Sequence, residues 1–126
     1  MHKSQLAGFI IDCQTDDLEG ATAFWAKALG IEAEADPDPV DPLYRQLETD
    51  PGGMHIEVQK VYHPSRVHLD IETDDIQMEV RRLEKLGARR IAEIKTWVVM
   101  EAPTGQRFCV VNPQRDNFED SANRWE

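Results

Sequence analysis

The chain has 126 residues, enough for one domain with its own hydrophobic core and too few for two ordinary domains. Its 14 lysines and arginines are outnumbered by 24 aspartates and glutamates, and the resulting net charge of −10 argues against binding to nucleic acid or to an anionic membrane surface. Because the sequence has no apolar run of membrane-spanning length, no signal segment and no CxxC pair, we expect a cytoplasmic protein with reduced thiols.

The first half of the chain is predicted to contain one helix among short strands. Alternating apolar residues predict a strand over 6–14, with Phe9 on the core face and Asp12 on the opposite face. Apolar residues at helical spacing predict a helix over 18–29 that Thr15, Asp16 and Asp17 cap and Gly30 ends, and Phe24 beside the apolar stripe is expected to pack in the core. The remaining segments are a weak strand, a proline-rich loop and two strands: 31–35, 36–42, 44–48 and 54–61.

The second half repeats this order. Over 66–72, three apolar residues alternate with His68, Asp70 and Glu72, which predicts a strand with one apolar and one polar face. Thr73 and Asp74 are suitable N-caps for a helix that ends at Gly87. Three more strands are predicted, over 88–94, 97–101 and 106–112. The polar tail 114–126 is expected to be loose, although its Phe118 and Trp125 favour partial docking.

The two halves are related by an internal repeat. The segment TDDL at 15–18 matches TDDI at 73–76, and at the same offset Ile10 corresponds to His68 and Asp12 to Asp70. Near the ends of the halves, 53–58 matches 105–110. Neither half could bury its sheet alone, so we expect the halves to pair.

The sequence resembles the vicinal oxygen chelate superfamily in its glyoxalase-like branch (glyoxalase/bleomycin resistance protein/dioxygenase). Three stretches carry the resemblance: IIDCQTDDLEGATAFWAKALG, RVHLDIETDDIQMEVRRLEKLGA and WVVMEAPTGQRFCVVNP. It implies an α+β fold in which two tandem βαβββ modules, about 6–61 and 66–113, form a cupped mixed β-sheet with helices on its outer face. Both modules are expected to belong to a single domain, 1–126.

The resemblance also implies a metal site. The ligand positions of metal-dependent members fall here on Ile10, Glu57, His68 and Cys109. Glu57 and His68 match the usual ligand types, Ile10 cannot ligate, and Cys109 replaces an expected carboxylate and suits only a soft metal. The alternatives are one divalent ion (Zn, Ni, Fe or Mn), with Asp70, His55 or Cys109 completing the ligand set, and a site that has lost its metal.

Two aspartates are candidate catalytic residues. The repeat places Asp12 and Asp70 on equivalent strand positions, where two carboxylates in one partly desolvated cavity would raise one pKa towards that of a general acid or base. The alternative for each aspartate is an ion pair with an arginine, such as Arg45, Arg66 or Arg107.

The candidate ligand-binding residues are His55, Cys109, Tyr44 and Trp97. The alternative to a ligand-binding role for Cys109 is that of a small, unreactive residue of the core.

Two functions follow from these patterns. The first is a small-molecule protein with a ligand-binding cup, whose metal site is incomplete and lost. The second is a metal-dependent lyase, isomerase or dioxygenase with His68 and Glu57 as ligands. In both cases the expected partners are a small-molecule ligand or substrate and a second copy of the chain in a homodimer.

Overall fold

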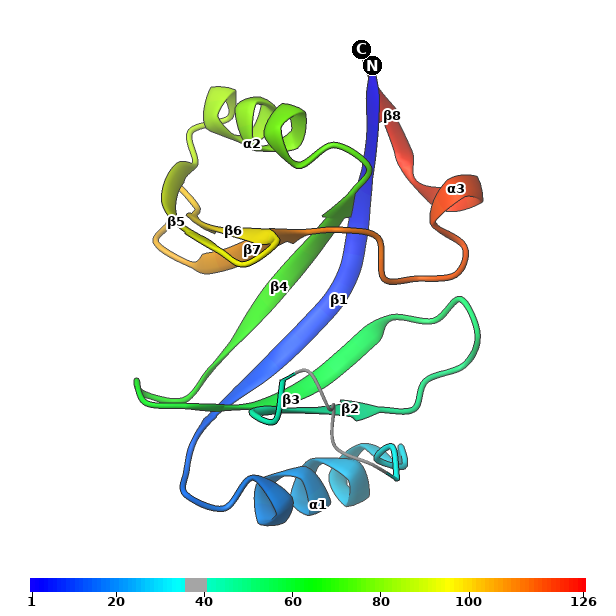
Figure 1. Ribbon diagram of the computed structural model, residues 1–126, viewed down its shortest axis with the longest axis vertical. Helices are drawn as coiled ribbons and strands as arrows, with labels where there is room; N and C mark the ends of the chain where they lie inside the picture. Colours follow the sequence, from blue (N-terminus) through cyan, green and yellow to red (C-terminus); the bar gives the residue numbers. More distant parts are fainter. Residues whose placement is uncertain (36–40) are drawn as a thin grey trace. The chain divides into compact units, whose positions relative to one another are not determined.

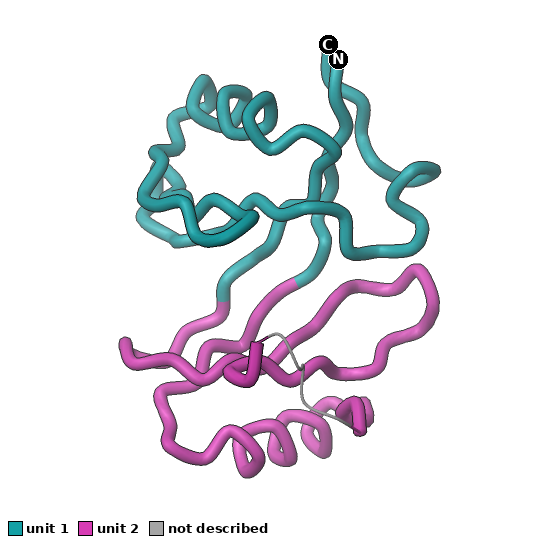
Figure 2. Tube along the Cα trace, in the orientation of Figure 1, with its two compact units in different colours: residues 1–8, 68–126 teal, residues 9–67 magenta. Residues whose placement is uncertain are grey.

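The computed structural model describes residues 1–35 and 41–126, so positions 36–40 of the predicted loop lie outside the described residues. Over the described residues the chain forms eight strands and three helices (Figure 1), which confirms the predicted α+β class. The chain divides into two compact units: unit 1 comprises residues 1–8 and 68–126, and unit 2 comprises residues 9–67 (Figure 2).

Unit 2 packs one helix on a small sheet. It contains residues 9–14 of β1 (His2–Gln14), together with α1 (Leu18–Leu29), β2 (Tyr44–Leu47) and β3 (His55–Val61). β2 and β3 are antiparallel, and the strand order that runs through this unit is β2-β3-β1. The core under α1 is formed by three buried aliphatic side chains, Leu47, Ile56 and Val58, with Trp25 packed against them.

Two expectations for unit 2 are wrong. The weak strand predicted over 31–35 is reduced to a single bridge between Ala33 and Leu47. Alternating glutamates give this segment little strand propensity, although the amide of Glu34 still donates to the carbonyl of Gln46 at 2.9 Å. Phe24 is 61% exposed rather than in the core, because its helix position turns it away from the sheet, and its ring makes an edge-to-face contact with Trp25.

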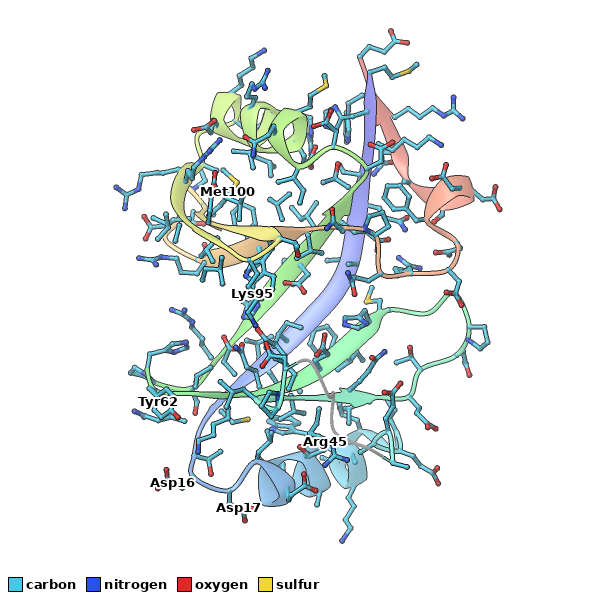
Figure 3. The ribbon with its side chains drawn as sticks, viewed as in Figure 1. Asp16, Asp17, Arg45, Tyr62, Lys95 and Met100 are labelled. Atoms are coloured by element: carbon cyan, nitrogen blue, oxygen red, sulfur yellow. The ribbon has the colours of Figure 1, made fainter. Side chains whose placement is uncertain are left out.

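Unit 1 contains the second repeat from His68 onward. It holds residues from His68 onward of β4 (Arg66–Thr73), followed by α2 (Ile76–Lys85), β5 (Arg89–Ile94), β6 (Trp97–Glu101) and β7 (Arg107–Val111). The strand order is β4-β7-β6-β5, with β4 and β7 parallel and the other neighbours antiparallel, so the sheet is mixed as predicted. α2 lies over β5, β6 and β7 (Figure 1) and covers a core of Val80, Leu83, Val98, Met100 (labelled in Figure 3) and Val110.

The internal repeat is reproduced in the hydrogen bonds that start the two helices. Asp17 (Figure 3) caps α1 by accepting from the amide of Gly20 at 2.9 Å, and Asp75 caps α2 by accepting from the amide of Met78 at 3.1 Å. In each case the threonine two residues earlier accepts from the amide of the capping aspartate. The N-cap of α2 is therefore Asp75 and not the predicted Thr73 or Asp74, whose side chains also bond to the backbone of Lys3 on β1.

The faces of β4 differ from a simple amphipathic strand. The polar side chains Asp70 and Glu72 are buried, whereas the apolar Val67 and Leu69 are 59% and 52% exposed. Ile71 alone of the three apolar residues packs against the core of unit 1. The polar face of β4 is thus the desolvated one, where unpaired charge is costly.

The expectation of a loose tail is wrong, and the docking that Phe118 and Trp125 favoured is observed. The tail forms α3 (Phe118–Ser121) and β8 (Asn123–Trp125), and β8 pairs with the start of β1, which brings the two termini side by side (Figure 1). Phe118 is buried, and the Trp125 indole donates to Ser4 Oγ at 2.8 Å. The carboxylate of Glu72 accepts hydrogen bonds from the backbone amides of Gln114 and Arg115 and so anchors the beginning of the tail.

A buried charge network lies beneath this tail. Glu79 is fully buried and accepts two hydrogen bonds from Arg82, while His2 Nε2 lies 2.7 Å from the same carboxylate. The Arg82 guanidinium in turn stacks 3.9 Å from the centre of the Trp125 ring. Burial opposes ionisation of Glu79, but hydrogen bonds from Arg82, His2 and Ser4 outweigh it and hold its pKa below the ordinary value.

No described helix is both long enough and apolar enough to cross a membrane.

Candidate functional site

Three potential metal-ligating side chains meet in unit 1. His68 and Asp70 project from β4, and Cys109 projects from the neighbouring strand β7. The Nε2 or Nδ1 atom of the histidine, a carboxylate oxygen and the Sγ atom all lie within 4.8 Å of one another. The parallel ladder explains the meeting, because Asp70 and Cys109 are direct Cα partners and His68 lies two residues before Asp70 on the same strand face. We refer to these three residues as the His68 cluster.

Asp70 is the most constrained member of the His68 cluster. Its residue surface is only 7% exposed, and its Oδ1 atom makes no hydrogen bond among the described residues. That oxygen lies 3.5 Å from His68 Nε2, too far for a charge-assisted hydrogen bond, which spans about 2.7–2.9 Å. A buried carboxylate oxygen without a hydrogen bond lowers the stability of the folded protein. This cost indicates that Asp70 is placed here for a function and not for stability.

The cluster fits a divalent transition metal. Histidine nitrogen, carboxylate oxygen and cysteine sulfur all ligate zinc, at about 2.0–2.3 Å, and three protein ligands with an open position are typical of a catalytic zinc site. Two ligand atoms on one tetrahedral ion are then about 3.3–3.6 Å apart. The observed 3.5 Å between His68 Nε2 and Asp70 Oδ1 agrees with that spacing.

The same face of unit 1 carries the residues that surround the cluster. Val99 on β6 is the Cα partner of Cys109, and Ala92 on β5 is the partner of Val99, so small side chains continue the row from Asp70 across the sheet. Trp97, a predicted ligand-binding residue, is half-buried at the end of β6, with Lys95 (Figure 3) 6.0 Å from its ring centre.

Arginines flank this row on its other side. Arg89 donates two hydrogen bonds to one oxygen of Glu101, and those bonds hold the pKa of Glu101 below its ordinary value. Arg107 makes one longer contact to the second oxygen, with Nε 3.4 Å from Oε1. The sequence indicated Arg107 only as a partner for an aspartate, whereas the structure places it beside Glu101. The sequence does hold a sign of this location, because Arg107 precedes Cys109 by two residues in a predicted strand and therefore lies on the same strand face.

The predicted ligand Glu57 belongs to unit 2 and has partners there. On β3 it contacts the His55 ring, and His55 Nδ1 in turn lies 3.4 Å from the side-chain amide of Gln46 on β2. Tyr44, another predicted ligand-binding residue, is half-buried on β2 opposite Gln59. The structure therefore brings His55 and Glu57 together in unit 2, and His68, Asp70 and Cys109 together in unit 1.

Asp12 is buried like its repeat partner Asp70 but has an arginine beside it. It is buried on β1 with Arg66 Nε at 3.7 Å from its Oδ2 atom, the arginine pairing weighed in the sequence. Arg45 is engaged elsewhere, by Glu19 and by the carbonyl of Glu34. Ile10, at the position equivalent to His68, is a buried aliphatic side chain with no ligating atom.

Comparison with known proteins agrees with this architecture. The family described as glyoxalase-like domain matches residues 8–111. No curated protein matches the sequence.

Solved structures share the fold at low sequence identity. Methylmalonyl-CoA epimerase from Mycobacterium tuberculosis is 16% identical, with a TM-score of 0.62 over 86% of this chain and 87% of that one. A variant of the Streptomyces coelicolor epimerase in complex with 2-nitronate-propionyl-CoA is 13% identical, with a TM-score of 0.54 over 89% and 97% of the two chains. A glyoxalase/bleomycin resistance protein/dioxygenase superfamily member from Vibrio splendidus 12B01 is 17% identical, with a TM-score of 0.51 over 85% and 98%.

Proposed function

Since this chain belongs to the glyoxalase-like domain family, we propose that it binds a small oxygenated molecule at the His68 cluster, with one divalent transition metal held by that cluster. The observation that carries the proposal is the Oδ1 atom of Asp70, which is buried, makes no hydrogen bond among the described residues and lies at ligand-to-ligand distance from His68 Nε2. Zn²⁺ is the best match to a donor set of nitrogen, oxygen and sulfur.

Each residue of the cluster has a defined part in this proposal. His68 offers a neutral imidazole nitrogen, Asp70 a carboxylate oxygen and Cys109 a thiolate. A metal bound there supplies a Lewis acid for substrate oxygens, the chemistry expected of a lyase, isomerase or dioxygenase in this family.

This assignment changes the predicted ligand pair. The sequence paired His68 with Glu57, whereas we now propose Asp70 and Cys109 as its co-ligands, because the contacts within unit 1 support that set. Glu57 is proposed to orient His55 in a separate polar group of unit 2.

A second candidate is a metal-free binding protein. It is supported by Ile10, a buried aliphatic side chain at a position where the resemblance implies a metal ligand. In that case His68 and Asp70 bind the ligand directly, and Asp70 serves as the acceptor for a ligand N–H or O–H group. The remaining proposals, a homodimer and a cytoplasmic location, rest on the family and on composition.

The metal content of purified protein tests the proposal. Untagged wild-type protein, prepared without chelator and then incubated with Zn²⁺ and desalted, is expected to retain close to one ion per chain by elemental mass spectrometry. His68→Ala is expected to lose it, while the matched control His63→Ala, a histidine that contacts a backbone carbonyl in the β3–β4 connection, keeps it. Metal retained by His68→Ala at the wild-type level would reject the cluster as the site. No metal in either protein would favour the metal-free candidate.

A further inference from the structure

The groups around the His68 cluster indicate the chemical class of its ligand. β4 and β7 run parallel, and Arg107 lies two residues before Cys109 just as His68 lies two residues before Asp70. Both residues therefore lie on the same side of the Asp70–Cys109 pair and on the same strand face. An arginine on β7 thus stands next to the proposed binding site.

The hydrogen-bonding capacity of Arg107 is largely unused. Among the described residues its one polar partner is Glu101, through Nε at 3.4 Å, and its side chain is 36% exposed. Because Nε faces Glu101, the two terminal nitrogens of the guanidinium remain for another acceptor. Those planar N–H groups match the geometry of a carboxylate, which arginine binds with two parallel hydrogen bonds.

The local charge balance also favours an anion. Arg89 and Arg107 share the single carboxylate of Glu101, and Arg89 makes the closer contacts to it. These three side chains together carry one net positive charge in a chain whose net charge is −10, and the carboxylate of Asp70 in the neighbouring cluster is the negative group that the proposed metal would offset. An excess cation next to a polar binding site attracts anionic ligands more strongly than neutral ones.

A row of small side chains lies on the sheet face between Arg107 and Trp97. Across β7, β6 and β5 the row beside Asp70 consists of Cys109, Val99 and Ala92, all of them small. Trp97 lies beyond this row, where its ring offers an apolar face. The N–H groups of Arg107 therefore lie at one end of this face and the aromatic ring of Trp97 at the other, with the row of small side chains between them.

We propose that the ligand of the His68 cluster is a small organic carboxylate, and that Arg107 determines this specificity by binding the carboxylate group. The inference rests on the proposed function, since it assumes that the His68 cluster is the binding site. It adds the class of the ligand and a specificity-determining residue that lies outside the cluster.

The test compares a carboxylic acid with its amide. Mandelate and mandelamide share an aromatic body and a 2-hydroxyl group and differ in charge at the terminal group. Titration calorimetry with both compounds on Zn²⁺-incubated protein is expected to show at least tenfold tighter binding of mandelate by the wild type. Arg107→Gln is expected to reduce this ratio to near one. Arg90→Gln is the matched control, because Arg90 is also 36% exposed but faces Glu93 and Gln77 on the opposite side of the sheet.

The outcomes separate this inference from the proposed metal site. If mandelate and mandelamide bind equally, if neither binds, or if Arg107→Gln keeps the wild-type ratio, the inference is overturned, whatever the metal content. If the ratio falls in Arg107→Gln alone while no variant retains metal, the carboxylate specificity stands and the metal proposal fails. A fall of the same size in Arg90→Gln would show an effect of net charge and would also overturn the assignment to Arg107.

Discussion

Asp70 on β4 and Cys109 on β7 are direct partners in a parallel ladder, and this pairing creates the candidate site. Each residue alone has an ordinary explanation, as a buried carboxylate or a small half-buried thiol. Together with His68 they form a set of three different donor atoms within 4.8 Å of one another. Because strand pairing fixes the backbone on both sides, the site is built on rigid elements rather than on loops.

Replacing Asp70 tests whether its burial serves function rather than stability. Asp70→Asn keeps the shape of the side chain and removes the charge, so we expect metal binding to be lost. The metal-free variant is expected to be about 1 kcal/mol more stable than the metal-free wild type, because the substitution removes the charge from a buried group whose Oδ1 atom makes no hydrogen bond. Urea unfolding in the presence of a chelator measures the difference, with the exposed Asp16→Asn as control. A clear loss of stability in Asp70→Asn would show that the carboxylate is structural.

The Glu79 network predicts a dependence of stability on acid pH. The pKa of folded Glu79 is lowered, so its contribution is present above the ordinary value of 4.5 and is lost as the pH falls through that value to the lowered one. We expect Glu79→Gln to lower the free energy of unfolding by about 2–3 kcal/mol at pH 7, since it breaks a buried ion pair, and to lose less stability than wild type on acidification. Denaturant melts at several pH values measure both effects. Exposed Glu84 lies on the same helix, and the acid profile of Glu84→Gln is expected to follow the wild type.

Trp125 is expected to hold the tail on unit 1. Trp125→Ala removes the hydrogen bond to Ser4 and the stacking with Arg82, and we expect it to cost about 2 kcal/mol of stability. Hydrogen exchange of the amides in β8 should become fast while that of β6 stays slow. Slow exchange in β8 of the variant would mean that the β1–β8 pairing alone retains the tail.

Much of this fold was predictable because its elements follow local rules. Period-2 and helical spacing placed both long helices and most strands, and the TDD repeat predicted two equivalent units whose capping bonds turn out to match. The segment over 31–35 was overestimated, because apolar alternation alone does not tell a strand from a single bridge. The tail was underestimated, since its docking depends on β1, which begins at His2, more than 100 residues earlier.

The composition of the candidate site depends on information that strand periodicity lacks. Alternation placed His68 and Asp70 on one face, but it cannot say which strand lies next to β4 or in which register. The β4–β7 pairing joins Cys109 to them and leaves Arg107 beside them. Hydropathy also predicts the wrong side chains to be buried on β4, because the apolar Leu69 is exposed while the charged Asp70 is buried. A residue that breaks the hydropathy rule in this way is a common sign of a functional site.

A Co²⁺ titration tests the central claim most directly, because a thiolate bound to Co²⁺ gives a ligand-to-metal charge-transfer absorption that histidine and carboxylate do not. The account predicts that wild type shows this absorption with an endpoint near one equivalent and that Cys109→Ser abolishes it. Cys13→Ser should leave it unchanged, because Cys13 packs against the core of unit 2 and burial raises the pKa of its thiol. An absorption that persists in Cys109→Ser and disappears in Cys13→Ser, or that is absent from wild type, would contradict the assignment of the His68 cluster as the metal site.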